Sequence, residues 1–348
     1  MKLLFITPKI KEDDDDFAFT SLWAKEFARQ GFEVTVICLE KGKHSLLFDS
    51  ELRAELPFPV YSLGKEERLP NWRWFLRFQK LILTIPYDRV FVHMNPRWLA
   101  AGVWYWALRR IPTYLWYTHY TQPLSLRIGD KIAKRMFAAT ADCLPQYNND
   151  PRKVVTGHGI DLDFWNVPMV PAEEREPSTN LLAVHRISRS KRIDIVLRAL
   201  KLLPKEYTLT HYGRPQDPRA DLEYYEEIKK LADSPELKGR VRFMGPVPMP
   251  ELKKIYPRYR VLVNMVPDTI DKTVLEAMYC GVIPVITLGH AKAIGFPHAP
   301  KDDSPEEVAS YIYNMKIEDS EYLRNIVREK HSLSGLVQKM GEYIRAGN

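Results

Sequence analysis

The sequence is poor in cysteine, in long apolar runs and in repeats. Its three cysteines, Cys38, Cys143 and Cys280, are an odd and widely spaced set, which argues against a disulfide framework and favours a reducing compartment. No run of 18 apolar residues occurs, so we expect no membrane-spanning helix. No short repeat or low-complexity segment is present beyond the aspartates at 13–16. Only six residues separate Lys2 from the next charge, so we expect no signal peptide and a cytoplasmic location.

The sequence does contain enough apolar material for two domains. The chain has 348 residues, of which 45% are hydrophobic and 27% charged, and this supports real cores. Its net charge of +7 is unevenly placed. Twelve Lys or Arg but only two acids fall between residues 68 and 135, together with six of the eight tryptophans. We therefore expect one surface to be basic and rich in aromatic side chains.

Strands and helices alternate along the chain. In the first half we predict a helix at 20–30 and strands at 2–7, 33–39, 88–94, 113–120 and 141–145. In the second half we predict helices at 194–203, 224–232 and 249–258 and strands at 181–185, 208–213, 241–245, 261–265 and 282–287. A polar, Pro-rich stretch at 166–180 is the best candidate for a linker. This pattern predicts two doubly wound α/β domains that face a cleft.

The segment DTIDKTVLEAMYCGVIPVI, residues 268–286, is typical of a loop, a helix, a tight turn and a buried strand. A helix N-terminus after a polar loop offers free backbone N–H groups to an anion. Asp268 and Glu276 would flank that anion, although carboxylates repel a phosphate. Two acids at this place suit hydroxyl groups, those of a sugar ring on one side and of a ribose on the other. The segment therefore predicts a nucleotide-sugar site.

This segment resembles the Glu-x7-Glu element of retaining glycosyltransferases, above all family 4 with the GT-B fold. The family form is roughly E-G-F-G-x4-E-A-M-A-x-G-x-P-V-V. The resemblance implies two Rossmann-like domains, an acceptor-binding one at 1–165 and a nucleotide-sugar-binding one at 166–330. Helices expected at 304–315 and 334–346 would then cross back, with 331–348 packing on the first domain. The chain keeps Glu276, Ala277, Met278, Gly281, Pro284 and Val285 and departs from the form at Asp268, Thr269 and Asp271.

A second motif, AVHRISRSKR, contains Arg186 and Lys191. Arg186 ends a predicted strand and Lys191 opens a helix, so a cation and a helix N-terminus together form an anion cradle. The motif resembles the family's G-R-L-x3-K-G, with His185 and Arg192 in place of the two glycines. The resemblance implies that the arginine and lysine hold the donor pyrophosphate. The alternative is a solvated basic loop, and the acidic pair further along the chain favours the site.

Histidines follow several predicted strands. His119 ends the strand at 113–120, and sites in open α/β sheets lie at the carboxyl ends of strands. A lone histidine at a strand end is usually structural, but the resembled family has a histidine here that faces the donor sugar. The resemblance makes His119 a catalytic candidate, and His93 a weaker one. The other strand-end histidines show no metal-ligand spacing, so we predict no metal site.

The resemblance also assigns roles within the donor site. Glu276 would bind the ribose hydroxyls, while Asp268 and His119 would orient the donor sugar. Arg186 and Lys191 would stabilise the leaving diphosphate in place of a metal, so neither a metal nor a cofactor is expected. Backbone N–H groups would assist them at Ile270, Asp271, Lys272 and Thr273. The base would rest against two strand ends, at Gly213, Arg214, Met244, Gly245 and Val247.

Four aspartates, Asp13 to Asp16, follow the first predicted strand. Many family members have two glycines here, close to the donor phosphates, whereas four carboxylates would oppose a pyrophosphate. We favour the alternative of a solvated acidic loop.

The segment 70–83 predicts a helix with a basic stripe at Arg73, Arg77 and Lys80, beside an aromatic face that includes Trp74. Such a helix suits a membrane interface, where about 1 kcal/mol per basic residue near an anionic leaflet would give reversible docking. Alternatively, it is a crossover helix that packs its aromatic side chains inward. Basic and aromatic residues also suit single-stranded nucleic acid, but no RNA-binding motif is present.

These features predict a retaining glycosyltransferase that transfers a hexose from a UDP- or GDP-linked sugar to a glycan or lipid-linked acceptor. Its partners would be the nucleotide sugar, the acceptor and, reversibly, the anionic cytoplasmic face of a membrane. A nucleotide-sugar-binding protein that has lost catalysis and a nucleotide-sugar epimerase stay open as alternatives. The net charge of +7 leaves a nucleic-acid-binding protein as a further one.

Overall fold

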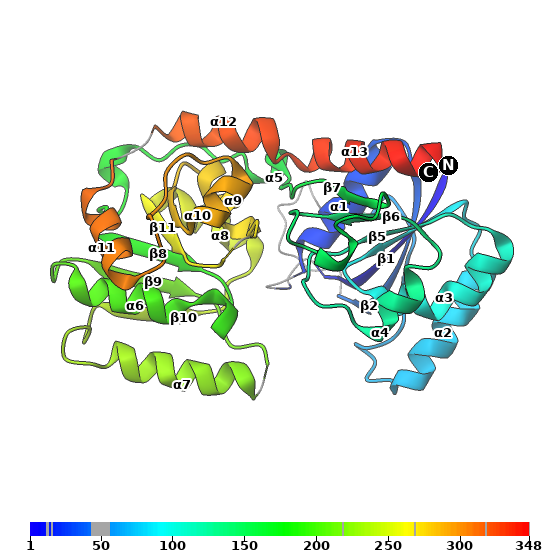
Figure 1. The fold of residues 1–348 in the computed structure, drawn as a ribbon, viewed down its shortest axis with the longest axis horizontal. Helices are drawn as coiled ribbons and strands as arrows, with labels where there is room; N and C mark the ends of the chain where they lie inside the picture. The colour runs from blue at the N-terminus through cyan, green and yellow to red at the C-terminus, as the bar shows by residue number, and fades with distance from the viewer. Residues whose placement is uncertain are drawn as a thin grey trace. The chain divides into compact units, whose positions relative to one another are not determined.

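Two compact units make up the chain in a computed structural model (Figure 1). The first comprises Met1–Gly157 with Leu333–Asn348, and the second comprises His158–Ser332. The sequence predicts that the chain passes between the domains at 165/166 and 330/331. The structure describes residues 1–11, 14, 17–42, 56–217, 219–267, 269–316 and 319–347. Four residues singled out from the sequence lie outside this described part, namely Asp13, Asp15, Asp16 and Asp268.

The first unit is built on a sheet in which the described residues form seven parallel strands. Their order is β3-β2-β1-β4-β5-β6-β7, and β1 is hydrogen-bonded to both β2 and β4. Leu3, Leu4 and Phe5 of β1 are fully buried, because parallel strands are covered on both faces. The strands are β1 (Lys2–Ile10), β2 (Glu33–Lys41), β3 (Val60–Ser62), β4 (Arg89–His93), β5 (Thr113–Trp116), β6 (Ala133–Ala138) and β7 (Lys153–Val155).

Particular residues of the first unit favour the start of a helix or hold two helices together. Helix α3 starts with Pro96, and the Asn95 side chain accepts a hydrogen bond from the Arg97 N–H at 3.2 Å. Helix α13 packs against α1, where Gln30 Nε2 donates to the Ser334 carbonyl at 2.9 Å. The C-terminal helix therefore belongs to the first unit. The helices are α1 (Phe19–Arg29), α2 (Asn71–Thr84), α3 (Pro96–Arg109), α4 (Leu124–Gly129) and α13 (Leu333–Ala346), with a 3₁₀ turn at Pro145–Tyr147.

The second unit has a smaller sheet of the same kind. Its described strands are all parallel, in the order β10-β9-β8-β11-β12. Strands β8 and β11 are neighbours, but β8 continues to β9 on one side and β11 to β12 on the other. This is the switch point of a doubly wound sheet. The strands are β8 (Asn180–Val184), β9 (Thr208–Tyr212), β10 (Val241–Gly245), β11 (Val261–Asn264) and β12 (Ile283–Ile286).

Helices of the second unit alternate with these strands. Helix α11 packs against α6, and α12 packs against α9. No helix in the described ranges is long and apolar enough to span a bilayer. The helices are α5 (Leu162–Trp165), α6 (Ile193–Leu202), α7 (Ala220–Ala232), α8 (Met249–Ile255), α9 (Lys272–Tyr279), α10 (Leu288–Ile294), α11 (Pro305–Asn314) and α12 (Ser320–Lys330), with 3₁₀ turns at Ala172–Glu174, Arg189–Lys191 and Tyr256–Arg258.

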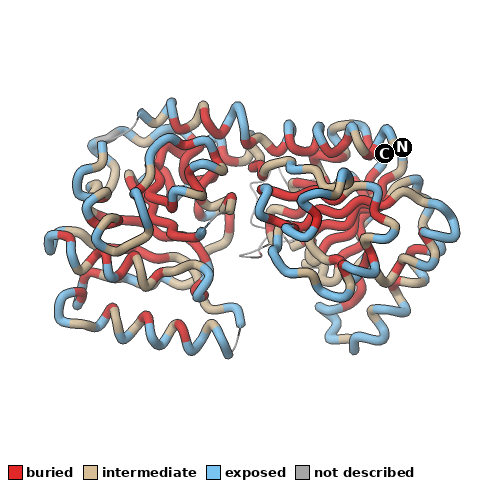
Figure 2. The backbone as a smooth tube through the Cα atoms, in the orientation of Figure 1, coloured by how far each residue is buried: buried red, intermediate tan, exposed pale blue. Residues whose placement is uncertain are grey.

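Each unit has its own core, drawn in red in Figure 2. The core of the first unit is rich in large rings, including Trp23, Trp106 and Trp116. The core around β8 and α6 is mostly aliphatic, with Leu181 and Leu197 fully buried. Both units are therefore large enough to be stabilised by their own apolar cores.

Three sequence expectations about elements were wrong. Residues 141–145 form turns, whereas Ala133–Ala138 form the strand, whose Lys134 and Arg135 interrupt the apolar pattern. The strand expected at 113–120 ends at Trp116, where its pairing with β4 ends. Helix α11 does not cross to the first unit, because its apolar side chains belong to the core around α6.

Candidate active site

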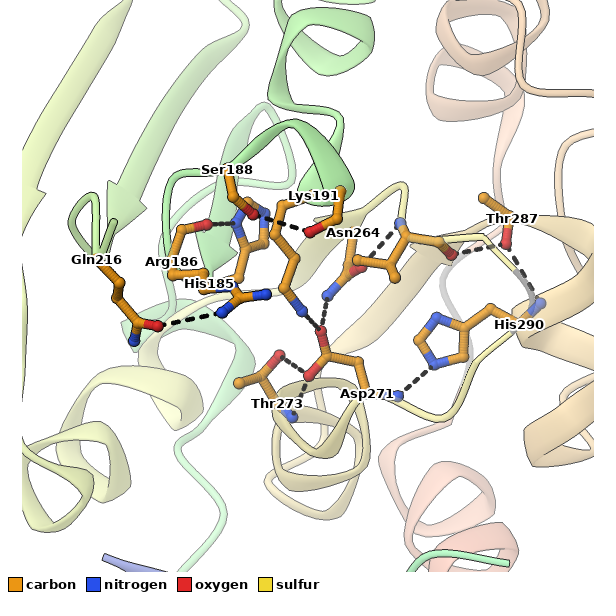
Figure 3. Close-up of polar contacts among 12 residues, drawn as sticks. His185, Arg186, Ser188, Lys191, Gln216, Asn264, Asp271, Thr273, Thr287 and His290 are labelled. Carbon is orange, nitrogen blue, oxygen red and sulfur yellow. Dashed lines mark hydrogen bonds and ion pairs between the residues drawn. The ribbon is translucent and has the colours of Figure 1, made fainter. Parts of the chain in front are cut away.

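Polar side chains gather at the carboxyl ends of β8 and β11, at the switch point of the second sheet (Figure 3). His185 directly follows β8, and Asn264 is the last residue of β11. The segments that follow these strands supply Lys191 and Asp271. Ligands of open α/β sheets bind at this place because the loops from the two central strands separate there.

The loop after β8 is held tightly against the loop after β9. His185 N–H donates to the Tyr212 carbonyl at 3.1 Å, and Ile187 N–H donates to the Arg214 carbonyl at 3.0 Å. Gly213 lies between them with a φ of +139°, and a Cβ there would sit 2.0 Å from the His185 carbonyl oxygen. Only glycine fits this close approach. The backbone that presents the next residue, Arg186, is therefore fixed.

Lys191 and Asp271 form the central ion pair of the site. The distance from Lys191 Nζ to Asp271 Oδ2 is 2.5 Å, and the two side chains are 18% and 11% exposed. Asn264 Nδ2 donates to the same oxygen at 3.1 Å. The other oxygen, Oδ1, accepts from the Thr273 N–H at 3.3 Å and from the Thr273 hydroxyl at 3.1 Å. Asp271 is thus the N-cap of α9, and its carboxylate accepts four hydrogen bonds.

The surroundings of Asp271 keep it ionised. Burial raises the pKa of this carboxyl group, but the Lys191 ammonium and the hydrogen bonds from Lys191 and Asn264 outweigh burial and hold the pKa well below its usual range. The neighbouring backbone positions differ in exposure, since Ile270 is buried whereas Lys272 and Thr273 are partly exposed. The Asp271 carboxylate at the start of α9 is therefore ionised, and the Lys191 ammonium balances its charge.

His290 fixes the opposite side of Asp271. The Asp271 N–H donates to His290 Nε2 at 3.1 Å, so this imidazole is neutral and carries its proton on Nδ1. Burial lowers the pKa of His290 to about 4, which agrees with the neutral form. Thr287 caps the helix of His290, because its hydroxyl oxygen accepts from the His290 N–H at 3.2 Å. The sequence points to neither His290 nor Thr287 as a site residue, because its apolar pattern predicts no helix at 288–294.

Other histidines around the site are also buried and neutral. Burial lowers the pKa of His185 to about 4 and that of His158 to about 3. Burial likewise holds the pKa of His211 well below its usual range, and its Nε2 lies 3.5 Å from His185 Nδ1. Among the described residues, no group of three or more His, Cys, Asp or Glu side chains is arranged to hold a metal ion.

Glu276 is a buried acid in the middle of α9. Burial raises its pKa to about 7, although the nearby Lys272 ammonium acts in the opposite direction. The Tyr256 hydroxyl donates to Glu276 Oε2 at 3.4 Å. The carboxyl group is therefore close to half-protonated at neutral pH. Sequence reasoning missed Tyr256 because it lies in a helical turn far from the motif.

The strand ends expected to hold the base lie side by side. The Gly213 N–H donates to the Gly245 carbonyl at 2.8 Å, which joins the ends of β9 and β10. Arg214 and Met244 are exposed, and Val247 is partly buried. A depression of about 630 Å³ lies beside Arg186, whose NH1 donates to Gln216 Oε1 at 3.1 Å. It is lined by Arg186, Ser188, Arg189, Ser190, Gln216, Asp217, Ala220, Asp221 and Glu223.

The remaining catalytic candidate, His119, lies in the first unit. It is exposed and follows β5 beyond Trp116, so it does not end the strand itself. Its ring contacts that of Tyr117, with the centroids 5.1 Å apart. His93, the weaker candidate, is buried at the end of β4, and its ring stacks on Trp116 at 5.2 Å. This packing indicates a structural role for His93.

Helix α2 presents an aromatic face different from the expected one. Trp74 packs partly buried against the first core, and Arg77 forms a bidentate pair with Glu67 at 2.8 and 2.9 Å. Arg73 and Lys80 are exposed. The outward rings and side chains instead belong to Trp72, Phe75, Leu76 and Leu83.

Solved structures of glycosyltransferases share this architecture. HepE of Anabaena in complex with UDP-glucose is similar over 99% of this chain and 100% of its own, with a TM-score of 0.76 and 16% identity. A glycosyltransferase of Rickettsia africae is similar over 99% and 98%, with a TM-score of 0.72 and 15% identity. Sucrose-phosphate synthase of Thermosynechococcus elongatus is similar over 99% of both chains, with a TM-score of 0.72 and 16% identity. These likenesses show that the two units form a GT-B fold.

Family models identify both halves of the chain. Residues 19–164 match the model described as Glycosyltransferase Family 4, and residues 178–315 match the model described as Glycosyl transferases group 1. No curated protein sequence matches the chain. The two matches span most of both units, with the motifs of Arg186, Lys191 and Glu276 inside the second. The chain belongs to the family 4, group 1 glycosyltransferases, and it is an enzyme of that kind.

Proposed function

We propose that this glycosyltransferase transfers a hexose from a UDP- or GDP-linked donor, with retention of anomeric configuration and without a catalytic metal. The proposal rests on the cluster of Arg186, Lys191 and the N-terminus of α9 at the switch point of the second sheet. Two cations beside a helix N-terminus suit a diphosphate. HepE, which has the same fold, was crystallised with UDP-glucose, so a UDP-sugar is the first donor to test.

In this proposal, residues of the second unit bind the diphosphate and the ribose of the donor. Lys191 and Arg186 stabilise the negative charge that develops on the leaving diphosphate, and in this proposal they replace a metal. Glu276 binds the ribose hydroxyls, which favours its ionised form and lowers its pKa from about 7. Asp268 and His119 orient the donor sugar. The acceptor attacks from the face that the diphosphate leaves, which retains the configuration.

A glycan or lipid-linked acceptor is the second part of the proposal, supported by one surface of the first unit. We name it the α2–α3 surface and define it by six exposed side chains: Trp72, Phe75, Leu76 and Leu83 on α2, and Trp104 and Leu108 on α3. Gln79 joins the two helices, because its Oε1 accepts from Trp104 Nε1 at 2.9 Å and its Nε2 donates to the Ala101 carbonyl at 3.0 Å. The apolar side chains therefore sit on a rigid base.

Basic side chains border this surface. The Arg73 guanidinium lies 5.2 Å from the centre of the Trp72 ring, and Lys80, Arg109 and Arg110 are exposed nearby in sequence. Exposed aromatic rings among cations complement an anionic lipid surface, at about 1 kcal/mol per basic residue. We propose reversible contact of the α2–α3 surface with the anionic cytoplasmic face of a membrane; the three free, buried cysteines support a reducing compartment. Sedimentation with phosphatidylserine vesicles at low salt tests the contact, and absence of binding would refute it.

A nucleotide-sugar-binding protein without catalysis is the leading rival among non-enzymes. The observation in its favour is that Lys191 is already paired with Asp271. Donor binding without transfer or hydrolysis to any acceptor would identify it. Nucleic-acid binding would instead give a gel shift that weakens steeply with salt.

A thermal-shift panel of UDP, GDP, ADP and their sugar conjugates, without added metal, tests the donor site. A ligand at about 100 times its dissociation constant should stabilise the protein by roughly 2.7 kcal/mol. Transfer should persist with excess chelator, and Lys191→Ala should lower kcat/KM by roughly a hundredfold or more. Lys254→Ala is the matched control, because that side chain on α8 is 74% exposed and pairs with Glu251. Unchanged turnover by Lys191→Ala would refute the site.

A further inference from the structure

The hydrogen-bond donors around the start of α9 already hold an anion, the carboxylate of the protein's own Asp271. Its carboxylate accepts from the Lys191 ammonium at 2.5 Å, the Asn264 amide at 3.1 Å, and the N–H and hydroxyl of Thr273 at 3.3 and 3.1 Å. A cation, a helix N-terminal N–H, an amide and a hydroxyl are also the donors that a phosphate group uses. Asp271 therefore occupies the groups that would bind a diphosphate.

Figure 3 shows how this arrangement is held from both sides. On one side the Asp271 N–H donates to His290 Nε2 at 3.1 Å, which turns that N–H away from any ligand. On the other side Lys191 reaches Asp271 from the turn that precedes α6. Lys272, the first residue of α9, adds a positive charge close to Glu276 and acts to lower the pKa of that acid. This geometry lets the Asp271 carboxylate compete with a phosphate group for the Lys191 ammonium.

We propose that Asp271 sets the affinity of the diphosphate site by competing with the diphosphate for Lys191. This inference rests on the proposed function. With the site empty, the carboxylate holds Lys191. When a diphosphate enters, the lysine exchanges the carboxylate for a phosphate oxygen, while Asp271 keeps its bonds to Asn264 and Thr273. When the product diphosphate leaves, Asp271 binds Lys191 again, so the residue weakens product binding as well.

A purely structural ion pair would behave differently. If the pair only held α9 to the turn before α6, its removal would lower stability and leave nucleotide affinity unchanged or weaker. If Asp271 competes with phosphate, its neutralisation must make nucleotide binding tighter. The sign of the change in affinity separates the two roles.

Asp271→Asn is the variant that removes the charge and keeps the cap, because Asn is as good an N-cap residue as Asp. Titration calorimetry with UDP and with GDP, using the full chain, should show a dissociation constant roughly ten- to a hundredfold lower than that of the wild type. In steady-state kinetics the donor KM and the inhibition constant of the free diphosphate should both fall. Asp271→Ser, which also caps a helix, should reproduce the effect if the Asn variant folds poorly.

A double-mutant cycle shows whether the gain passes through Lys191. In a Lys191→Ala background, Asp271→Asn should give no gain in affinity, because the contested cation is absent. Asp319→Asn is the matched control, since Asp319 caps α12 through the Glu321 N–H at 3.1 Å, and it should leave nucleotide affinity unchanged.

Three outcomes would overturn the inference. Wild-type binding that Asp271→Asn leaves equal or weaker would overturn it while the donor site stands. A gain that persists without Lys191 would also overturn it, because the effect would then be general charge repulsion. Failure of the wild type and of both Asp271 variants to bind either nucleotide would overturn the inference together with the proposed donor site.

Discussion

The two units of this glycosyltransferase place the first five strands of their sheets in the same order, but different side chains pack at the two switch points. In the first unit, His93 at the end of β4 lies against Trp116 and Trp23, with ring centroids 5.2 and 4.8 Å apart. In the second unit, the same place holds the Lys191–Asp271 pair and its polar partners. The backbone thus creates the position, and the side chains decide whether it is packed or binds a charged ligand.

The difference extends to the exposed surfaces. The first unit places Trp72 and Trp104 in solvent, 60% and 50% exposed, and encloses its switch point in rings. The second unit buries its neutral histidines, such as His185 and His211, beneath a charged site. An ion pair also lies at the end of β1 in the first unit, where Lys9 Nζ is 2.6 Å from Asp14 Oδ2, so the two switch points differ in aromatic packing and not in charge alone. This contrast suggests that donor chemistry belongs to the second unit and contact with the acceptor's surroundings to the first.

The sharpest test of the contrast uses one glycine from each unit. Gly213→Ala should lower the free energy of unfolding by about 3 kcal/mol, because the new Cβ would lie 2.0 Å from the His185 carbonyl at a φ of +139°. Gly31→Ala should cost only about 1–2 kcal/mol, because its φ of +85° is unfavourable but nothing lies within 4 Å. Denaturant unfolding measures both. Equal losses would contradict the tight approach of β8 and β9 at the site.

Much of the fold could be predicted from the sequence, because parallel strands buried on both faces are short apolar runs between helices. β8 to β12 were all expected close to their observed positions. The strand of Ala133–Ala138 was missed, since Lys134 and Arg135 interrupt its apolar pattern. Helix α3 was missed because its own apolar side chains are distributed over all of its faces, so the sequence shows no amphipathic stripe.

The candidate site was partly predictable for a different reason. Arg186, Lys191 and Glu276 were found because their motifs resemble a family, and the structure places Lys191 next to the start of α9. Asn264 was missed although one signal was present, a polar residue that ends an apolar strand. The role of Asp271 needed the structure, because a sequence shows that an acid replaces a glycine but not which cation it contacts.

An intermediate effect should come from the α2–α3 surface. Replacing both Trp72 and Leu76 by Ser should weaken partition onto phosphatidylserine vesicles by about tenfold. The two apolar side chains that would be buried in the membrane interface are then absent. Folding stability should barely change, because both are more than half exposed. Tyr313→Ser is the control, a 63% exposed ring on α11 of the second unit. An equal loss in the control, or equal binding to neutral vesicles, would break the assignment of membrane contact to the first unit.

The smallest effect is a pH dependence that should be confined to the second unit. The pKa of Glu276 is raised from 4.5 to about 7 in the folded protein, so folding favours its protonated form. Its contribution to stability is complete below about pH 4.5 and is lost as the pH rises through 7. Between pH 5.5 and 6.5 the free energy of unfolding should therefore fall by up to about 1 kcal/mol more in the wild type than in Glu276→Gln, which stays neutral.

Subtracting the two unfolding curves isolates this term. The buried histidines of the second unit have lowered pKa values, so they lose stability as the pH falls, and they do so equally in both proteins. Hydrogen exchange then locates the difference, which should be found in the amides of α9 and β12 and not in β1 or β4. Parallel curves for the wild type and Glu276→Gln would mean that Glu276 is ionised throughout, and the carboxylate would then be ready for a ribose without any change in protonation.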